Sequence, residues 1–190
     1  IELRQLQQQI GITFLFVTHD QEEALPLSDQ IAVMSEGEVM EIASPGQLYE
    51  SPGSRFVADF IGSMNFFEGE ISSSTDSAVT VQTPVLGEVK VTGSDAGVST
   101  GQQVWVAIRP EKMQPVFSDP GESANTAGGT MGLSAYLGDR SHFYVHLPQR
   151  EDPVLVALQN LERSMSHLHK PNQPVWLQWA SDAVVVLPRD

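Results

Sequence analysis

A continuous apolar run near the start of the chain is its clearest hydrophobic pattern. The run from Ile12 to Val17 holds five apolar residues and one threonine, without alternation between apolar and polar positions. Such a run predicts a strand buried on both faces, as in a parallel sheet. It stops at Thr18, His19 and Asp20, where open α/β sheets place their ligands. We expect Asp20 to cap the next helix, with Glu23 completing a variant of the capping box.

The pattern on either side of this run predicts short helices and one hairpin. Apolar residues at helical spacing, cap residues, and glycines at the expected helix ends define the helices. Two apolar runs around a turn-forming segment define the hairpin. The predicted helices span 1–10 and start at Gln21, Ser44 and Ser51, the last closing at Gly62, and the hairpin strands span 31–34 and 39–42.

The pattern changes after Gly62, where short β-rich runs separated by turns replace the helices. Such runs predict an all-β barrel or sandwich. The predicted strands are 66–71, 78–82, 87–91, 103–108, 112–117, 131–137, 142–147, 154–158, 175–179 and 183–187. Residues 118–129 are expected to form a mobile loop because they are rich in Gly, Ser and other turn formers. We therefore predict two domains, residues 1–62 and 63–190.

Composition narrows the classes of partner. The chain has 10 Lys and Arg against 24 Asp and Glu, a formal charge of -14, so nucleic acid is a poor partner for its surface. It has no cysteine, which excludes disulfides and thiolate metal sites. No apolar run approaches the roughly 18 residues of a membrane-spanning helix. The chain begins at Ile1 inside a predicted helix, without a signal peptide or initiator Met, so we expect a fragment of a longer protein.

Residues 18–24 read T-H-D-Q-E-E-A, which resembles the switch-histidine (H-loop) motif T-H-D-x-x-E-A of ABC-type ATPases. Two later segments are similar to the same family: 34–39 resembles its M-x-x-G-x-[IV] turn, and 56–62 its F-V-A-x-F-I-G exit. At 43–45, A-S-P stands where many members carry G-T-P. The alternative for His19 is a histidine that only caps a helix or completes a strand end.

The second half resembles the TOBE region, an OB-like regulatory domain attached to many importer ATPases. Ile108-Arg109-Pro110-Glu111 matches its [IL]-R-P-E element. Pro110 is expected to rigidify the end of a strand, and Arg109 to pair with a nearby carboxylate. Further segments look like the putrescine/polyamine subgroup of importer ATPases: 66–69, 136–139, 158–160 and 179–187.

The resemblance implies the α/β end of a P-loop nucleotide-binding domain followed by an all-β TOBE domain. In such ATPases the switch histidine contacts the γ-phosphate, so His19 is the implied catalytic residue, with Asp20, Glu23, Arg109, Pro110 and Glu111 in structural or regulatory roles. The implied cofactors of the whole subunit are ATP and Mg²⁺. The implied partners are a second copy, membrane permease subunits and, indirectly, a periplasmic polyamine-binding protein. The implied location is the cytoplasmic face of a bacterial inner membrane.

The chain contains no G-x-x-x-x-G-K-[ST] P-loop, no L-S-G-G-Q signature and no Walker B strand. We therefore expect the chain alone to be inactive, although the parent subunit hydrolyses ATP. One alternative is a non-catalytic regulatory or dimerisation module. Another keeps the ATPase and changes its cargo to sugar or ferric iron.

Histidine and tryptophan residues outside these motifs suggest weaker alternatives. His142 and His146 share a strand face, where surface histidines are a simpler account than a zinc site, so no metal site is expected. Trp105, Trp176 and Trp179 are expected to pack in a core, although a cation-recognition site is the alternative. Trp176 and Trp179 are expected on opposite faces of their strand.

Overall fold

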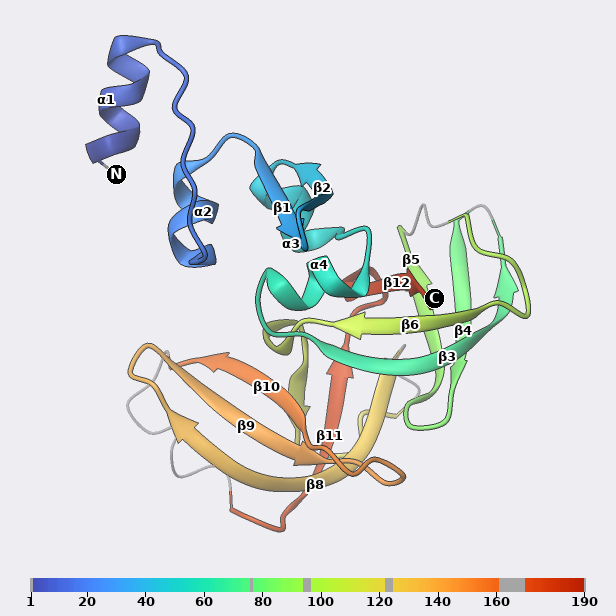
Figure 1. The fold of residues 1–190 in the computed structure, drawn as a ribbon. Helices are drawn as coiled ribbons and strands as arrows, with labels where there is room; N and C mark the ends of the chain where they lie inside the picture. Colours follow the sequence, from blue (N-terminus) through green and yellow to red (C-terminus); the bar gives the residue numbers. More distant parts are fainter. Residues whose placement is uncertain (1, 76, 94–96, 122–124, 161–169, 190) are drawn as a thin grey trace. The chain divides into compact units, whose positions relative to one another are not determined.

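The computed structural model describes residues 2–75, 77–93, 97–121, 125–160 and 170–189. The chain divides into two compact units, Ile1–Gly62 (unit 1) and Ser63–Asp190 (unit 2). Figure 1 shows that unit 1 carries the helices, whereas unit 2 is built from strands. The division falls where the sequence pattern changes from helical spacing to short β-rich runs.

Unit 1 contains short elements, with a long irregular segment between the first two helices (Figure 1). The hairpin turn places Glu36 and Gly37 at φ 51° and 85°, the two positive values that a type I′ turn requires. Gly11, at φ 71°, ends the first helix as predicted. The elements are α1 (Glu2–Ile10), α2 (Gln21–Leu27), β1 (Ile31–Ser35), β2 (Glu38–Ala43), α3 (Pro45–Glu50) and α4 (Arg55–Phe60).

Local capping explains where α3 and α4 begin. Ser44, the predicted start of this helix, forms a capping box with Gln47. The start of α4 was predicted too early: Ser54, and not Ser51, is its N-cap, because the Ser54 hydroxyl accepts the Val57 N–H at 3.3 Å. These helices cover one face of the hairpin over a small buried cluster of Val33, Leu48, Val57 and Ile61.

The prediction of a buried strand at Ile12–Val17 is wrong for the described structure. The segment has no regular secondary structure, and Leu15 and Val17 are 93% and 88% exposed. A strand needs a partner for its backbone N–H and C=O groups, and no described strand pairs with this segment. The apolar run therefore lacks the neighbouring strands and covering layers that its sequence pattern requires.

Unit 2 contains two five-stranded antiparallel sheets in the orders β12-β6-β3-β4-β5 and β10-β9-β8-β11-β7. The predicted all-β architecture is confirmed, and each predicted strand corresponds to an observed one. The strands are β3 (Asn65–Ser74), β4 (Ala78–Thr83), β5 (Gly87–Thr92), β6 (Gln103–Ile108), β7 (Gln114–Val116), β8 (Asn125–Tyr136), β9 (Arg140–His146), β10 (Val154–Gln159), β11 (Pro174–Trp179) and β12 (Val184–Pro188). Single 3₁₀ turns, Pro110–Lys112 and Ser181–Ala183, precede β7 and β12.

The loop predicted at 118–129 is wrong at its end, because β8 already starts at Asn125. Residues 122–124 lie outside the described part of the chain. Gly128 and Gly129 suggested a loop, but both are closely packed inside the sheet, and Gly129 leaves no room for a side chain. A Cβ on Gly129 would lie 2.6 Å from the His146 carbonyl oxygen, and one on Gly128 would lie 3.3 Å from the Trp176 ring.

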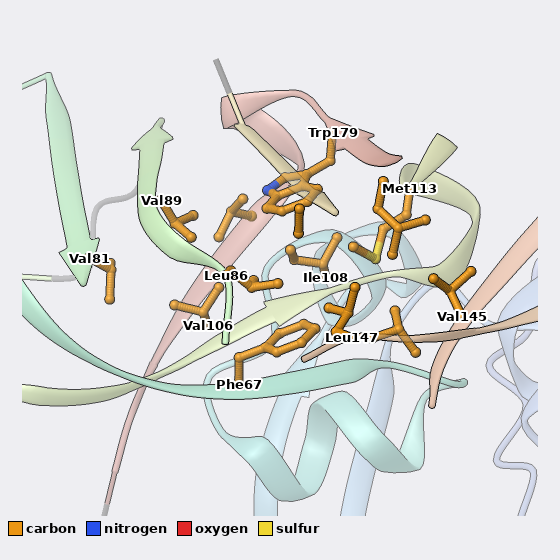
Figure 2. Close-up of a cluster of buried hydrophobic side chains, with 14 of the residues drawn as sticks. Phe67, Val81, Leu86, Val89, Val106, Ile108, Met113, Val145, Leu147 and Trp179 are labelled. Carbon is orange, nitrogen blue, oxygen red and sulfur yellow. The ribbon is translucent and has the colours of Figure 1, made fainter. Parts of the chain in front are cut away.

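One continuous core fills the space between the two sheets (Figure 2). It is formed mainly by the inward-facing residues of strands in which buried and exposed positions alternate. Figure 2 shows Phe67, Ile108, Met113, Val145 and Trp179 in this core. Trp179 is 4% exposed. This core is much larger than the buried cluster of unit 1, so unit 2 has the burial expected of a self-supporting domain.

Two buried asparagine side chains also connect the sheets by hydrogen bonds. Asn65, the first residue of β3, donates to the Leu155 carbonyl at 2.8 Å and accepts the Leu155 N–H at 2.9 Å. Asn125, the first residue of β8, makes the same pair of bonds with the backbone of Lys90, both at 2.8 Å. Each side-chain amide therefore pairs with the backbone of one residue in the opposite sheet's edge strand, as a neighbouring strand would.

Candidate functional site

The residues around His19 form a compact hydrogen-bonded corner between the apolar run and α2. The Thr18 hydroxyl donates to Glu23 Oε2 at 2.8 Å and accepts the Asp20 N–H at 3.0 Å. Asp20 is the N-cap of α2, as predicted, and its carboxylate accepts the Glu22 N–H at 2.8 Å. The predicted capping box is wrong in its second half, because the Glu23 carboxylate bonds to the Thr18 side chain.

His19 lies at the centre of this corner and is exposed to solvent. Its imidazole makes no hydrogen bond or ion pair with another described residue. The Thr18 side chain before it and the Asp20 N–H after it are hydrogen-bonded to each other, while both ring nitrogens stay available. An imidazole in this state can donate one hydrogen bond and accept another, as contact with a phosphate oxygen and a water would require.

A large apolar surface accompanies this corner in unit 1. Part of it lies on α1 and the segment that follows, and part on the hairpin strands β1 and β2. The exposed residues are Leu3, Leu6, Ile10, Ile12, Phe14, Leu15, Phe16, Val17, Met34, Val39, Met40 and Ile42. These side chains are 45–93% exposed, and together they exceed what isolated surface positions explain.

The Arg109 element lies at the junction of β6 and the turn before β7. Arg109 is 3% exposed and donates from Nη1 to the Ser63 carbonyl at 3.3 Å. Pro110 is buried and opens the 3₁₀ turn, whereas Glu111 is exposed. The element therefore fixes the first residues of unit 2 against β6, and the pairing of Arg109 with a carboxylate stays a prediction.

Two segments that resemble the polyamine subgroup meet at the β8–β9 turn. Asn160 donates from Nδ2 to the Gly138 carbonyl at 2.9 Å and accepts the Ser141 hydroxyl at 2.8 Å. The Asn160 N–H also donates to the Asp139 carbonyl at 2.8 Å. The two segments that resemble the polyamine subgroup are therefore hydrogen-bonded to each other at this turn.

Arg150 is a structural residue that the sequence analysis missed. Its guanidinium donates from Nη1 to the Phe66 carbonyl at 2.7 Å and from Nε to the Asp152 carbonyl at 2.8 Å. It also lies 4.6 Å from the Phe67 ring centroid. Burial lowers the pKa of Arg150 from its ordinary value, while the Asp152 carboxylate opposes that shift. Arginine stays charged at neutral pH, so these contacts are made by a cationic guanidinium.

The other described histidines and the tryptophans do not form a site together, and His167 and His169 lie outside the described residues. His142 and His146 share the outer face of β9, and no described cluster of three or more His, Cys, Asp or Glu residues is arranged to hold a metal ion. Trp176 and Trp179 lie on opposite faces of β11, as predicted, with Trp176 36% exposed. Trp105 is partly exposed and carries the Arg189 guanidinium 5.2 Å from its ring centroid. Core packing was therefore the right prediction for Trp179 alone.

Comparison with known proteins agrees with both halves of the sequence pattern. Residues 106–187 match the family model of the TOBE domain. The spermidine/putrescine import ATP-binding protein PotA of Chromobacterium violaceum is 51% identical over 96% of this chain and 50% of its own length. The chain is a homologue of the polyamine-import ATP-binding proteins. The protein of the same name from Trichodesmium erythraeum is 37% identical over 93% of this chain and 47% of its own length.

A relative named for putrescine transport matches a similar share of this chain. The putrescine transport ATP-binding protein PotG of Escherichia coli is 35% identical over 98% of this chain and 49% of its own length. The chain therefore spans about half the length of the curated relatives it matches.

A solved structure supports the fold. The cytoplasmic molybdate-binding protein ModG is similar with a TM-score of 0.55 and 14% identity, over 66% of this chain and 96% of that one. At this identity the likeness concerns the fold alone, and it agrees with an all-β OB-like TOBE domain. A P-loop domain is not shown in this chain. Among the described helices none is long and apolar enough to cross a membrane.

Proposed function

We propose that this chain is the C-terminal part of the ATP-hydrolysing subunit of an ABC importer for putrescine or other polyamines. The observation that carries the proposal is its similarity, over 93–98% of its length, to about half of each of several polyamine-import ATP-binding proteins. Unit 1 is then the end of the nucleotide-binding domain, and unit 2 is the regulatory domain.

The uncovered apolar surface of unit 1 supports this division. A chain of twice the length, like those of the relatives, contains enough additional protein to bury it. In particular, a parallel sheet in the missing half would pair with residues 12–17 and turn them into the strand that their pattern predicts. His19 would then lie at the carboxyl end of that strand, at the sheet edge where α/β proteins bind ligands.

The residues present supply only one part of an ATP–Mg²⁺ site. The chain has no P-loop sequence, and no metal-ligand cluster occurs among its described residues. Binding of nucleotide and metal is therefore assigned to the rest of the subunit, and the chain alone is expected to be inactive. The contribution of this chain is the His19 imidazole, a donor and acceptor for a terminal phosphate and the water beside it.

The partners follow from the same proposal. Two copies of the subunit associate through their nucleotide and regulatory domains, and both act on membrane permease subunits at the cytoplasmic face of the bacterial inner membrane. A periplasmic polyamine-binding protein is an indirect partner. Nucleic acid is not expected as a partner, because the net charge of -14 would repel it.

The first experiment uses the full-length protein encoded by the natural gene. His19→Ala should leave ATP binding largely intact and lower kcat for hydrolysis about 100-fold or more, the usual cost of losing a group that stabilises developing charge. The matched control is His146→Ala, which removes an exposed histidine of unit 2 and should keep wild-type turnover. Wild-type turnover in the His19 variant would remove the catalytic assignment.

The cargo needs a second experiment, because the ATPase subunit does not have to contact it. The subunit is reconstituted in vesicles with the permease and binding protein encoded beside it, and ATP-dependent uptake of putrescine, maltose and ferric iron is compared. Uptake of putrescine supports the proposal. Uptake of the sugar or of iron instead would retain the ATPase and refute the polyamine assignment.

A further inference from the structure

We infer that Thr18 and Glu23 are positioning residues that link the residues on both sides of His19 and thereby orient its imidazole for ATP hydrolysis. This inference rests on the proposed function, because it assumes that His19 acts on nucleotide in the full-length subunit. It concerns the hydrogen bonds that link Thr18, Asp20 and Glu23 around the histidine.

The direction of these hydrogen bonds follows from chemistry. An ionised carboxylate only accepts, so the single proton of the Thr18 hydroxyl is directed to Glu23 Oε2, 2.8 Å away. The oxygen lone pairs of that hydroxyl are then free to accept the Asp20 N–H, 3.0 Å away. One side chain therefore spans His19 and ties the residue before it to the residue after it.

Glu23 makes this arrangement stronger than a solitary threonine turn would be. A hydrogen bond to a charged acceptor is shorter and stronger than one between neutral groups. Because Glu23 belongs to α2, it also attaches the corner to the helix. The Asp20 cap adds a second attachment through the Glu22 N–H at 2.8 Å.

His19 needs such support because its own side chain has no described partner. With no hydrogen bond to another described residue, the ring depends on the backbone for its position. Catalytic groups must be held within about 0.5 Å of the productive geometry, and a displacement of about 1 Å can cost roughly 100-fold in rate. The corner is therefore expected to affect turnover more than nucleotide binding.

Glu22 provides the control that separates this role from a simple helix-dipole effect. Glu22 and Glu23 are both exposed carboxylates in the first turn of α2, where negative charge is favourable. Only Glu23 bonds to Thr18. Removing either carboxylate changes the interaction with the dipole similarly, but removing Glu23 alone breaks the link across His19.

The test measures ATP hydrolysis by the full-length protein carrying each substitution. Thr18→Val and Glu23→Ala should each lower kcat about tenfold or more, with KM for ATP within about twofold, because placement and not binding is disturbed. Thr18→Ser keeps the hydroxyl and should restore most of kcat, while Glu22→Ala should match wild type. A loss in Glu22→Ala equal to that in Glu23→Ala would overturn the inference in favour of the dipole.

A double-mutant cycle shows whether the corner acts through His19. In a His19→Ala background, Thr18→Val should cause no further loss of the residual rate, because there is no imidazole left to orient. A further loss of the same size as in wild type would overturn the inference and indicate an independent structural role. Thermal unfolding of each variant identifies any that fail to fold, in which case the Ser and Val variants at position 18 are compared at matched folded fractions.

Amide hydrogen exchange gives a readout that does not depend on activity. In the nucleotide-free full-length protein, Thr18→Val should increase exchange of the Asp20 amide severalfold, since its acceptor is removed, whereas Glu22→Ala should not. Unchanged exchange and unchanged kcat in Thr18→Val, with His19→Ala inactive, would overturn the inference and leave the proposed function standing. An active His19→Ala would overturn both.

Discussion

Asn65 and Asn125 are the residues on which the cohesion of unit 2 depends most specifically. Each satisfies both backbone groups of one residue in an edge strand of the other sheet, at distances of 2.8–2.9 Å. Both are nearly fully buried, at 5% and 1% exposed. Leaving such groups without partners costs more than the hydrogen bond contributes when formed, so these amides have no equivalent hydrophobic substitute.

We predict that Asn65→Ala lowers the free energy of unfolding of unit 2 by about 2 kcal/mol, because it leaves the Leu155 N–H and C=O without their hydrogen-bond partner. All three tryptophans of the chain lie in unit 2, so urea unfolding followed by their fluorescence reports on this unit. The control is Gln82→Ala, an exposed position on β4, expected within about 0.5 kcal/mol of wild type. Equal stabilities of the two variants would contradict the assigned role of Asn65.

Residue-scale features could be predicted from the sequence where their partners are local. The Asp20 cap, the Ser44 capping box and the Gly37 turn depend on residues within four positions, and all three are present. Asn65 and Asn125 could not be recognised, because their partners lie 90 and 35 positions away. The only signal was a polar residue at the start of each strand, which many strands share.

At the scale of elements, strands were predicted well where one face is buried and the period of two is visible, as in β9 and β11. The prediction was wrong at the start of β8, where closely packed glycines give the sequence the composition of a loop. It was also wrong for residues 12–17, because a strand of a parallel sheet exists only beside its neighbours. The apolar pattern of residues 12–17 requires neighbouring strands and covering layers, which the described residues do not provide.

The double substitution Leu15→Asp with Val17→Asp should have opposite effects in two contexts. In this chain alone both side chains are exposed, so we expect a higher soluble yield and an unchanged tryptophan unfolding transition. In the full-length protein these positions become buried under the proposed function. There the new carboxylates would be buried without partners, and soluble expression should be lost.

Leu133→Asp is the matched control for that experiment. Leu133 is 76% exposed in unit 2, and the substitution should be tolerated both in this chain and in the full-length protein. Soluble expression of the full-length protein with Asp at 15 and 17 would show that residues 12–17 stay exposed there. That result would remove the principal structural support for placing them in a nucleotide-binding sheet.

At the scale of the whole molecule, the two units differ in how complete they are. Unit 2 encloses a core shared by both sheets, whereas the buried cluster of unit 1 comprises four residues. His19 was proposed as a site residue from its motif, but the Thr18–Glu23 bond was not predicted, since the motif equally allowed a capping box. Cargo could not be predicted physically, because no residue of this chain has to touch it.

The intact mass of the protein produced from its natural gene is the measurement that decides among these interpretations. A unit of about sixty residues whose buried cluster comprises four described residues buries too little surface to be stable alone, since even complete domains of roughly this size are marginal. We therefore predict a mass about twice the 20.7 kDa of this chain, matching relatives of which it spans 47–50%. Peptide sequencing of the additional part should reveal a G-x-x-x-x-G-K-[ST] phosphate loop. A natural product of about 20.7 kDa would leave His19 without a nucleotide site, and a regulatory module would then be the better account.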